Sequence, residues 1–243
     1  LQDGRSNSYH YSVESWSRWC KKHNCELMIM DEPMLPESEM LITWQRWNVL
    51  EILEHNDIEY DQVLVVDADS IVHPNCPNFF KLTNSKFTTQ LTDGCYEWVN
   101  RAITGYSQSF FGKDRRLKAY EFFQFVILNK NHKDFLKYAL NFYTKNAEDI
   151  IKSYETHRTG SDIALMNCLR AEYGVDMNIL PREFSIMDVT RKNLLYYDEG
   201  MYWSDTLDNL FNSGWIYQFT SIPENTMGRT RKYWMERIYK ELY

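Results

Sequence analysis

Two carboxylates that follow an apolar run are the side chains of this sequence best placed to do chemistry. Residues 63–66 (VLVV) lead into Asp67, and Asp69 comes after the small residue Ala68. Residues two apart in an extended chain point the same way, so both carboxylates can converge on one divalent cation, with Ala68 leaving the space between them open. The triplet is therefore a candidate site for Mn²⁺ or Mg²⁺. The alternative is a pair of strand-end residues that cap a turn.

A sheet has to hold this triplet in place. An apolar run without polar alternation is typical of a strand covered on both faces, as in a parallel sheet between helices. Ligands bind at the carboxyl ends of such strands, where Asp67 and Asp69 would stand. Helical and strand patterns alternate along the chain, without a repeat or a Gly/Ser-rich linker. We therefore predict an α/β fold, a single Rossmann-like domain with a mostly parallel central sheet flanked by helices.

Periodicity places the individual elements. Helices are predicted over residues 8–23, 41–55 and 96–106, after Asn129, from Ser161 to Gly174 and over 231–242. Strands are predicted over residues 26–30, 63–66, 86–90, 122–128, 177–180 and 215–220, with a short helical turn over 78–82. Residues 105–118 are polar, basic and aromatic without a clear period, and we predict a mobile loop there.

Composition excludes several classes of function. The 27 Lys and Arg residues against 34 Asp and Glu give a net charge of −7, without the basic block that would follow a nucleic-acid backbone. No run approaches the ~18 apolar residues of a membrane span, and no charged-then-apolar leader opens the chain. Five cysteines, odd in number and without a CxxC pair, indicate neither a disulfide framework nor a zinc site. We expect a cytoplasmic location, no nucleic-acid partner and no membrane span.

Several segments of the chain resemble one enzyme family. Residues 60–72 (YDQVLVVDADSIV) closely resemble the DxD strand of GT-A glycosyltransferases, which use nucleotide sugars. Further along, residues 123–129 (FQFVILN) are similar to the acceptor-side strand of that family. Residues 161–167 (SDIALMN) resemble the start of a helix in the retaining branches of the family. Residues 179–181 (ILP) resemble the Leu-Pro that follows this helix. Together and in this order, the segments are specific for the family. Each of them alone is not.

The resemblance implies a domain plan and a reaction. It implies one GT-A domain over residues 1–243, with a nucleotide-sugar-binding half at about 1–95 and an acceptor-side half at about 96–243. The family's first strand is not visible, and because the chain starts with Leu1 rather than Met we expect that strand to be missing. The implied reaction moves a sugar from a nucleotide-diphosphate sugar, expected to be UDP-linked, to a saccharide or other hydroxyl acceptor, with retention of configuration.

The resemblance also implies roles for single residues in the donor site. Asp67 and Asp69 would hold the cation, and Ala68 and Arg46 would contact the donor. Lys232 belongs to a basic segment that resembles the Lys-Pro-Trp that meets the leaving diphosphate. For Arg46 the alternative is a solvated helix face, and for Lys232 an ordinary basic surface turn.

Three further residues are implied in catalysis and metal binding. Asp162 would orient the donor sugar or the acceptor; the alternative is a first-turn carboxylate that the helix dipole stabilises by ~0.3–1 kcal/mol. Gln124, with Phe125, replaces the usual Asn-x-Gly of the acceptor strand. Gln218 stands where the family has a histidine as third metal ligand. An amide oxygen can bind Mg²⁺ or Mn²⁺, but it is neutral and weaker than imidazole toward manganese.

Two other functions stay open. A phosphohydrolase of the haloacid-dehalogenase type also has four hydrophobic residues before Asp-x-Asp, and its first aspartate attacks phosphorus. In this sequence two predicted helices precede the motif, and no convincing acidic pair follows it. A non-catalytic module that binds sugar nucleotides would account for Gln218 and for the altered acceptor strand.

Overall fold

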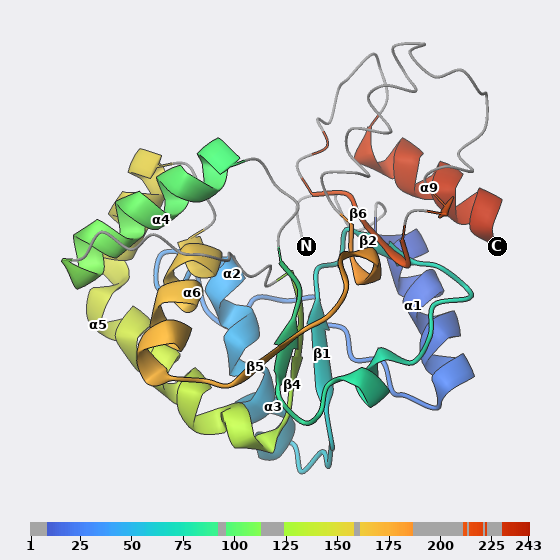
Figure 1. Ribbon diagram of the computed structural model, residues 1–243, viewed down its shortest axis with the longest axis horizontal. Coiled ribbons are helices and arrows are strands. Elements are labelled where there is room, and N and C mark those ends of the chain that lie inside the picture. Colours follow the sequence, from blue (N-terminus) through green and yellow to red (C-terminus); the bar gives the residue numbers. More distant parts are fainter. Residues whose placement is uncertain are drawn as a thin grey trace. The chain divides into compact units, whose positions relative to one another are not determined.

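The computed structural model describes residues 9–91, 96–112, 124–157, 161–186, 211–212, 214–220, 222 and 230–243. The chain divides into two compact units (Figure 1). Unit 1 comprises Leu1–Asp31, Val66–Leu82 and Pro181–Tyr243, and unit 2 comprises Glu32–Val65 and Thr83–Leu180. The boundary falls inside strand β1 (Val63–Val66), so the acidic triplet belongs to unit 1. The single domain expected over residues 1–243 stays a prediction.

Unit 2 is built on a four-stranded sheet. The strand order is β1, β4 (Phe125–Leu128), β3 (Phe87–Thr89), β5 (Met177–Ile179). Strand β3 runs antiparallel to β4, with Thr88 opposite Ile127, and parallel to β5, with Thr88 opposite Asn178. The α/β class is therefore confirmed, whereas the sheet is small and mixed, and the mostly parallel arrangement is not confirmed.

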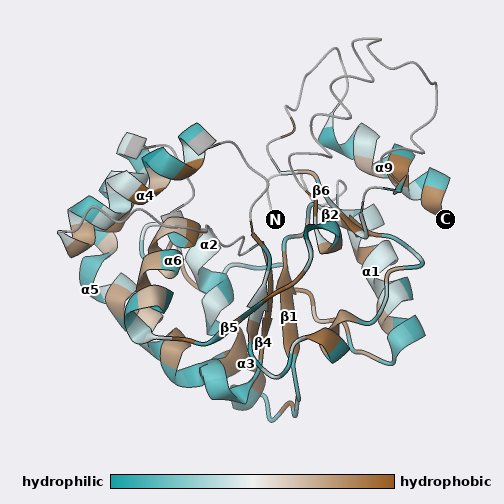
Figure 2. Ribbon diagram, in the orientation of Figure 1, coloured by the Kyte–Doolittle hydropathy of each residue, from teal (hydrophilic) through white to brown (hydrophobic). Residues whose placement is uncertain are grey.

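Strand β1 differs from the expectation of a strand covered on both faces. All four of its residues are half-buried. The physical reason is its place in the sheet, because β1 stands at one end of the described strand order with β4 as its neighbour. Figure 2 shows the apolar colour of β1 along its length. Apolar content alone therefore did not distinguish an edge strand from a central one.

Helices gather on one side of this sheet (Figure 1). They are α2 (Ile42–Gln45), α3 (Val49–His55), α4 (Tyr96–Phe111), α5 (Lys133–His157) and α6 (Ser161–Tyr173), with a 3₁₀ turn, η2 (Arg46–Asn48), between α2 and α3. The helix predicted over residues 41–55 is thus broken into three pieces. The buried Gln45 side chain accepts from the backbone N–H of Met34 and Leu35 and donates to the carbonyl oxygens of Leu35 and Met40. It therefore ties the preceding loop to the first piece.

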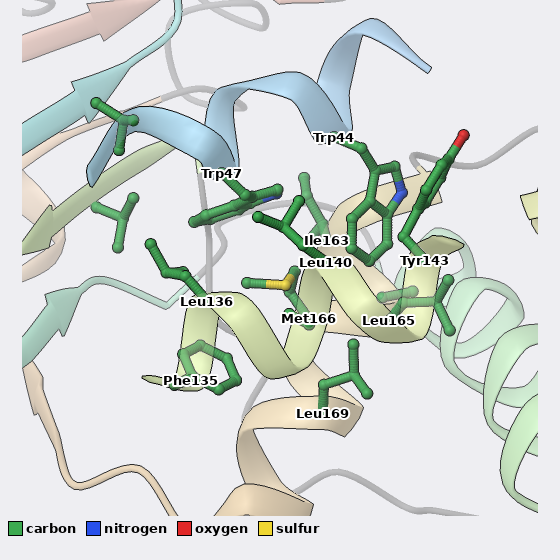
Figure 3. Packing of buried hydrophobic residues seen from close by; sticks show 14 of the residues in the cluster. Trp44, Trp47, Phe135, Leu136, Leu140, Tyr143, Ile163, Leu165, Met166 and Leu169 are labelled. Carbon is green, nitrogen blue, oxygen red and sulfur yellow. The ribbon is translucent and has the colours of Figure 1, made fainter. Parts of the chain in front are cut away.

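The core of unit 2 lies between these helices (Figure 3). Trp44 and Trp47 come from the predicted apolar stripe, and they are 0% and 1% exposed. They pack with apolar side chains of α5 and α6, among them Leu136, Leu140, Ile163 and Met166. The helical spacing of apolar residues in the sequence therefore identified the buried faces correctly.

Unit 1 has a smaller core around a two-stranded sheet. Strands β2 (Ser70–Val72) and β6 (Ile216–Gln218) pair antiparallel, with Ser70 opposite Gln218. Helix α9 (Arg231–Leu242) buries Trp234 and Met235 against Ile71 and Tyr217 of this sheet. Helix α1 (His10–His23) also packs on β2 and α9. The unit also contains the 3₁₀ turns η3 (Phe79–Leu82) and η5 (Arg182–Phe184).

Two predicted elements are wrong. Residues 26–30 form no strand, and Leu27, Met28, Ile29 and Met30 are 40–52% exposed. Among the described residues no strand is hydrogen-bonded to them, and an apolar run becomes a strand only with such a partner. Residues 105–111 continue helix α4 instead of forming a loop, and 113–118 lie outside the described residues.

None of the described helices combines the length and the apolar character that crossing a membrane requires.

Candidate functional site

The acidic triplet forms the connection between β1 and β2. Strand β1 ends at Val66 and β2 begins at Ser70, so Asp67, Ala68 and Asp69 fill the gap between the two strands. The Ser70 hydroxyl donates to the carbonyl oxygen of Asp67 at 2.7 Å and accepts from the indole N–H of Trp16 at 3.0 Å. Asp67 is half-buried and Ala68 is exposed. A short hydrogen-bonded turn therefore fixes the triplet.

The carboxylate of Asp69 contacts a hydroxyl and a guanidinium within unit 1. The hydroxyl of Thr220 lies 3.2 Å from both carboxylate oxygens. A guanidinium nitrogen of Arg231, Nη1, lies 3.7 Å from Oδ2. The backbone N–H of Phe219 also donates to the carbonyl oxygen of Asp69 at 2.8 Å, which extends the β2–β6 pairing by one residue. Asp69 is thus held against the end of β6, facing a hydroxyl and a positive charge.

Gln218 does not contact Asp69 in the described hydrogen bonds. Its side chain is fully buried, and Nε2 donates to the hydroxyl of Ser185 at 3.1 Å. Its Oε1 is buried and has no hydrogen-bond partner among the described residues. Thr220, which contacts Asp69 instead, was missed by sequence reasoning. The available signal was the period of two, which gives residues 218 and 220 the same face of an extended strand.

The donor set of unit 1 is chemically suited to a hard cation. Asp67 and Asp69 supply carboxylates and Thr220 a hydroxyl, and Gln218 has a buried amide oxygen without a partner among the described residues. Oxygen ligands are those that Mg²⁺ and Mn²⁺ prefer. Within the described residues, no group of three or more His, Cys, Asp or Glu side chains could hold a metal. A third ligand drawn from the described residues would thus be a neutral oxygen.

The basic residues at the start of α9 are arranged differently from the expectation. Lys232 is exposed, whereas its neighbour Arg231 approaches Asp69. The hydroxyl of Thr230 caps the helix by accepting from the backbone N–H of Tyr233 at 3.2 Å. The structure therefore brings Arg231, rather than Lys232, to the acidic triplet. Arg229 belongs to the same basic segment as Arg231 and Lys232, and it lies outside the described residues.

Unit 2 brings two of the other predicted residues together. Arg46 donates to Oδ2 of Asp162 through Nη2 at 2.7 Å and through Nε at 3.1 Å. The indole N–H of Trp47 donates to the same oxygen at 3.3 Å. Arg46 and Asp162 were predicted separately, one as a donor contact and one as a catalytic residue. Trp47 was predicted only as part of an apolar stripe, so its polar role was missed.

Gln124 lies at the end of the sheet of unit 2 where strand β4 begins. It directly precedes β4 and is 9% exposed. The antiparallel pairing brings the start of β4 next to the end of β3, where Gln90 is also buried. The hydroxyl of Thr89 donates to the carbonyl oxygen of Phe125 at 2.9 Å and so joins the two strands at this edge. Residue 123 lies outside the described residues.

Comparison with known proteins adds a fold assignment. No protein-family model matches the sequence, and the search of curated proteins found no match. Among solved structures, one described as a glycosyltransferase involved in the glycosylation of the major capsid of PBCV-1 superposes with a TM-score of 0.55 and 11% identity, covering 98% of this chain and 95% of the other. The apo-form glycosyltransferase GlyE of Streptococcus pneumoniae TIGR4 gives a TM-score of 0.40 and 13% identity, covering 98% and 60%.

The chain has a glycosyltransferase fold. This assignment rests on the first of the two structures, which covers nearly the whole of both chains. It confirms the prediction of a glycosyltransferase fold, whereas the GT-A assignment, the DxD motif and the retaining branch stay predictions. Fold does not establish activity, so the reaction has to be argued from the site.

Proposed function

We propose that this protein is a metal-dependent glycosyltransferase that moves a sugar from a nucleotide-diphosphate sugar to a hydroxyl acceptor. The observation that carries the proposal is the arrangement of Asp67 and Asp69. The two carboxylates stand in a fixed turn directly after β1, in a chain that has a glycosyltransferase fold. Thr220 and Arg231 contact the carboxylate of Asp69. An acidic pair beside a hydroxyl and a guanidinium suits the binding of a metal–diphosphate group.

The reaction needs stabilisation of negative charge on the leaving group. Breaking the bond between sugar and diphosphate leaves charge on the β-phosphate, and a bound Mn²⁺ or Mg²⁺ would act there as a Lewis acid. Asp67 and Asp69 would hold that cation, with Gln218 as the candidate neutral ligand. Lys232 and its neighbour Arg231 would add positive charge beside the leaving diphosphate.

Unit 2 is proposed to recognise the sugars. The carboxylate of Asp162 would orient a hydroxyl of the donor sugar or of the acceptor. Arg46 would hold that carboxylate in position, since it donates to Oδ2 twice. Gln124 would contact the acceptor, a saccharide or other hydroxyl compound. The donor is proposed to be UDP-linked and the configuration to be retained, both on the resemblance of residues 60–72 and 161–167 to the retaining branches.

The location is proposed to be cytoplasmic, in keeping with the cysteines. Among the described residues, Cys20, Cys25 and Cys76 are free thiols. Free thiols persist in reducing compartments, where disulfides are rare.

The decisive experiment measures donor hydrolysis. Purified protein is incubated with a panel of UDP-sugars and Mn²⁺, and released UDP is quantified for the wild type and for Asp69→Asn. We expect a loss of about 10²-fold or more, because Asp69 would hold the cation that stabilises the negative charge developing on the leaving diphosphate in the transition state. Asp61→Asn is the matched control, since Asp61 is an exposed aspartate just before β1. Equal turnover by Asp69→Asn and the wild type would refute the metal-ligand role.

The same panel separates the two alternatives. A non-catalytic module would bind UDP, as a shift in melting temperature shows, but would release none from any donor. A phosphohydrolase would release phosphate from a generic phosphomonoester such as p-nitrophenyl phosphate, in a reaction that Asp67→Asn abolishes because the first aspartate is then the nucleophile.

A further inference from the structure

The ion pair between Arg231 and Asp69 joins a permanent cation to a residue proposed to bind a metal. We propose that Arg231 is a resident counter-ion of Asp69 which the incoming divalent cation has to displace, so that the guanidinium lowers the affinity of the site for metal. This inference rests on the proposed function, because it concerns the same carboxylate. The inference adds Arg231 as a residue that sets the affinity of the site for metal.

The geometry shows a guanidinium that is close to Asp69 but loosely bound. Nη1 of Arg231 lies 3.7 Å from Oδ2, which is an ion-pair contact and longer than a hydrogen bond. Nε of Arg231 is buried and has no hydrogen-bond acceptor among the described residues. Both side chains are partly shielded from water, with 21% of Arg231 and 12% of Asp69 exposed. The interaction between Arg231 and Asp69 is thus weak, and a divalent cation that binds Asp69 more tightly can replace the guanidinium.

Arginine is suited to this role because its charge is permanent. A guanidinium stays protonated at every pH at which proteins fold, so Arg231 cannot yield its place by losing a proton. A divalent ion bound to Asp69 would meet a positive charge a few ångströms away. Repulsion at such a distance is substantial even near a protein surface, so the two cations compete for the carboxylate.

The backbone around the pair is anchored within unit 1. Arg231 is the first residue of α9, and Trp234 and Met235 in the next turn are 2% and 0% exposed. The hydroxyl of Thr220 contacts both oxygens of Asp69. Displacement therefore requires only rotation of the Arg231 side chain, because Thr220 still orients the carboxylate after the guanidinium has left.

The test is direct binding of Mn²⁺, followed by the electron paramagnetic resonance signal of the free ion. Arg231→Gln removes the competing charge, and we expect its Kd for Mn²⁺ to fall by about tenfold relative to the wild type. Arg231→Lys keeps the charge and should bind Mn²⁺ as weakly as the wild type. Arg237→Gln is the matched control, because Arg237 lies on the same helix and pairs with Glu241 at 3.1 Å.

The outcomes separate this inference from the proposed function. Tighter binding by Arg231→Gln but not by Arg237→Gln supports the inference, as does a Mn²⁺ site present only in Arg231→Gln. Unchanged or weaker binding by Arg231→Gln, when the wild type binds Mn²⁺ and Asp69→Asn does not, overturns the inference and leaves the metal site standing. Absence of binding by every variant overturns both. Equal tightening by Arg231→Lys would also overturn the inference, because the effect would then not depend on charge.

Discussion

Arg46 and Asp162 lie 116 residues apart in the sequence, and Nη2 of the arginine is 2.7 Å from Oδ2 of the aspartate. Asp162 is 1% exposed at its side chain and Arg46 is 13% exposed. The indole N–H of Trp47 donates to the same oxygen. Three N–H groups thus converge on one carboxylate oxygen, which fixes the orientation of the Asp162 carboxylate. A residue held in this way is suited to position a ligand.

The first prediction concerns the stability of this pair. Asp162→Asn removes the charge that compensates Arg46, and breaking one side of a buried pair leaves the other charge uncompensated. We expect the free energy of unfolding to fall by about 3 kcal/mol, measured by urea denaturation. The double variant Arg46→Met/Asp162→Leu removes both charges and should recover most of that loss. A loss that persists in the double variant would contradict this account.

The second prediction concerns Gln218, whose buried Oε1 lacks a partner among the described residues. Gln218→Met keeps the length of the side chain and removes both polar atoms. We expect the metal-free stability to change by no more than about 1 kcal/mol, because loss of the bond to Ser185 is offset by removal of an unsatisfied carbonyl. If Oε1 is the neutral metal ligand, Kd for Mn²⁺ should rise several-fold.

The complementary substitution at this position is Gln218→His. Imidazole binds manganese more strongly than an amide oxygen, so a site that includes residue 218 should need less Mn²⁺ for half-maximal activity. An unchanged requirement for Mn²⁺ in both Gln218→Met and Gln218→His would remove Gln218 from the set of ligands.

Local patterns in the sequence predicted the helices well. Helix α9 has the predicted bounds, and α1 begins within two residues of its predicted start. Both carry apolar side chains at helical spacing, and such faces depend on neighbours within one or two turns. The break at Gln45 was not predictable in this way. It comes with four hydrogen bonds to backbone groups of the preceding loop, which only the folded chain brings within reach.

Long-range pairing limited what could be predicted for strands and for the site. The apolar run 26–30 has strand character but no strand partner among the described residues. At the site, the roles of Asp67, Asp69, Gln218 and Lys232 stay predictions, and the described contacts of the Asp69 carboxylate come from Thr220 and Arg231. These two residues lie two positions after Gln218 and one before Lys232. A resemblance between distant sequences does not resolve so small a shift, because it depends on the pairing of β2 with β6 and on where α9 starts.

The third prediction concerns stability at acidic pH. Burial lowers the pKa of His132 below its ordinary value of 6.5, and Nδ1 of its ring accepts from the backbone N–H of Asn129. The unfolded chain therefore takes up this proton at a higher pH than the folded protein does. Stability should be fully present above about pH 6.5 and should fall as the pH drops below it, by at most about 1.4 kcal/mol per pH unit for one histidine.

A variant at position 132 separates this effect from general acid sensitivity. His132→Gln keeps a side chain able to accept from the N–H of Asn129, as in a capping box, but removes the titrating ring. Urea denaturation between pH 5 and pH 7.5 should show a flatter pH dependence for this variant. The pKa of His73 is also lowered, by burial and by Lys22, and accounts for part of the remaining slope.

The last prediction compares the two buried tryptophans of the first helical pieces in unit 2. Trp44 and Trp47 are almost equally buried, but only the indole N–H of Trp47 has a described acceptor, the carboxylate of Asp162. The indole N–H of Trp44 is buried without a partner among the described residues. Replacement by phenylalanine leaves a similar cavity at each position, so the difference between the two variants reports the hydrogen bond.

We expect Trp47→Phe to lower the free energy of unfolding by roughly 2 kcal/mol more than Trp44→Phe, since a bond to a charged acceptor is lost only in the first variant. If Asp162 orients a sugar, Trp47→Phe should also raise KM for the donor or the acceptor, whereas Trp44→Phe should not. Equal losses of stability would mean that the N–H of Trp47 contributes nothing to holding Asp162. An unchanged KM with the expected loss of stability would instead confine Asp162 to a structural role, because the carboxylate would then be free to reorient without consequence for the substrate.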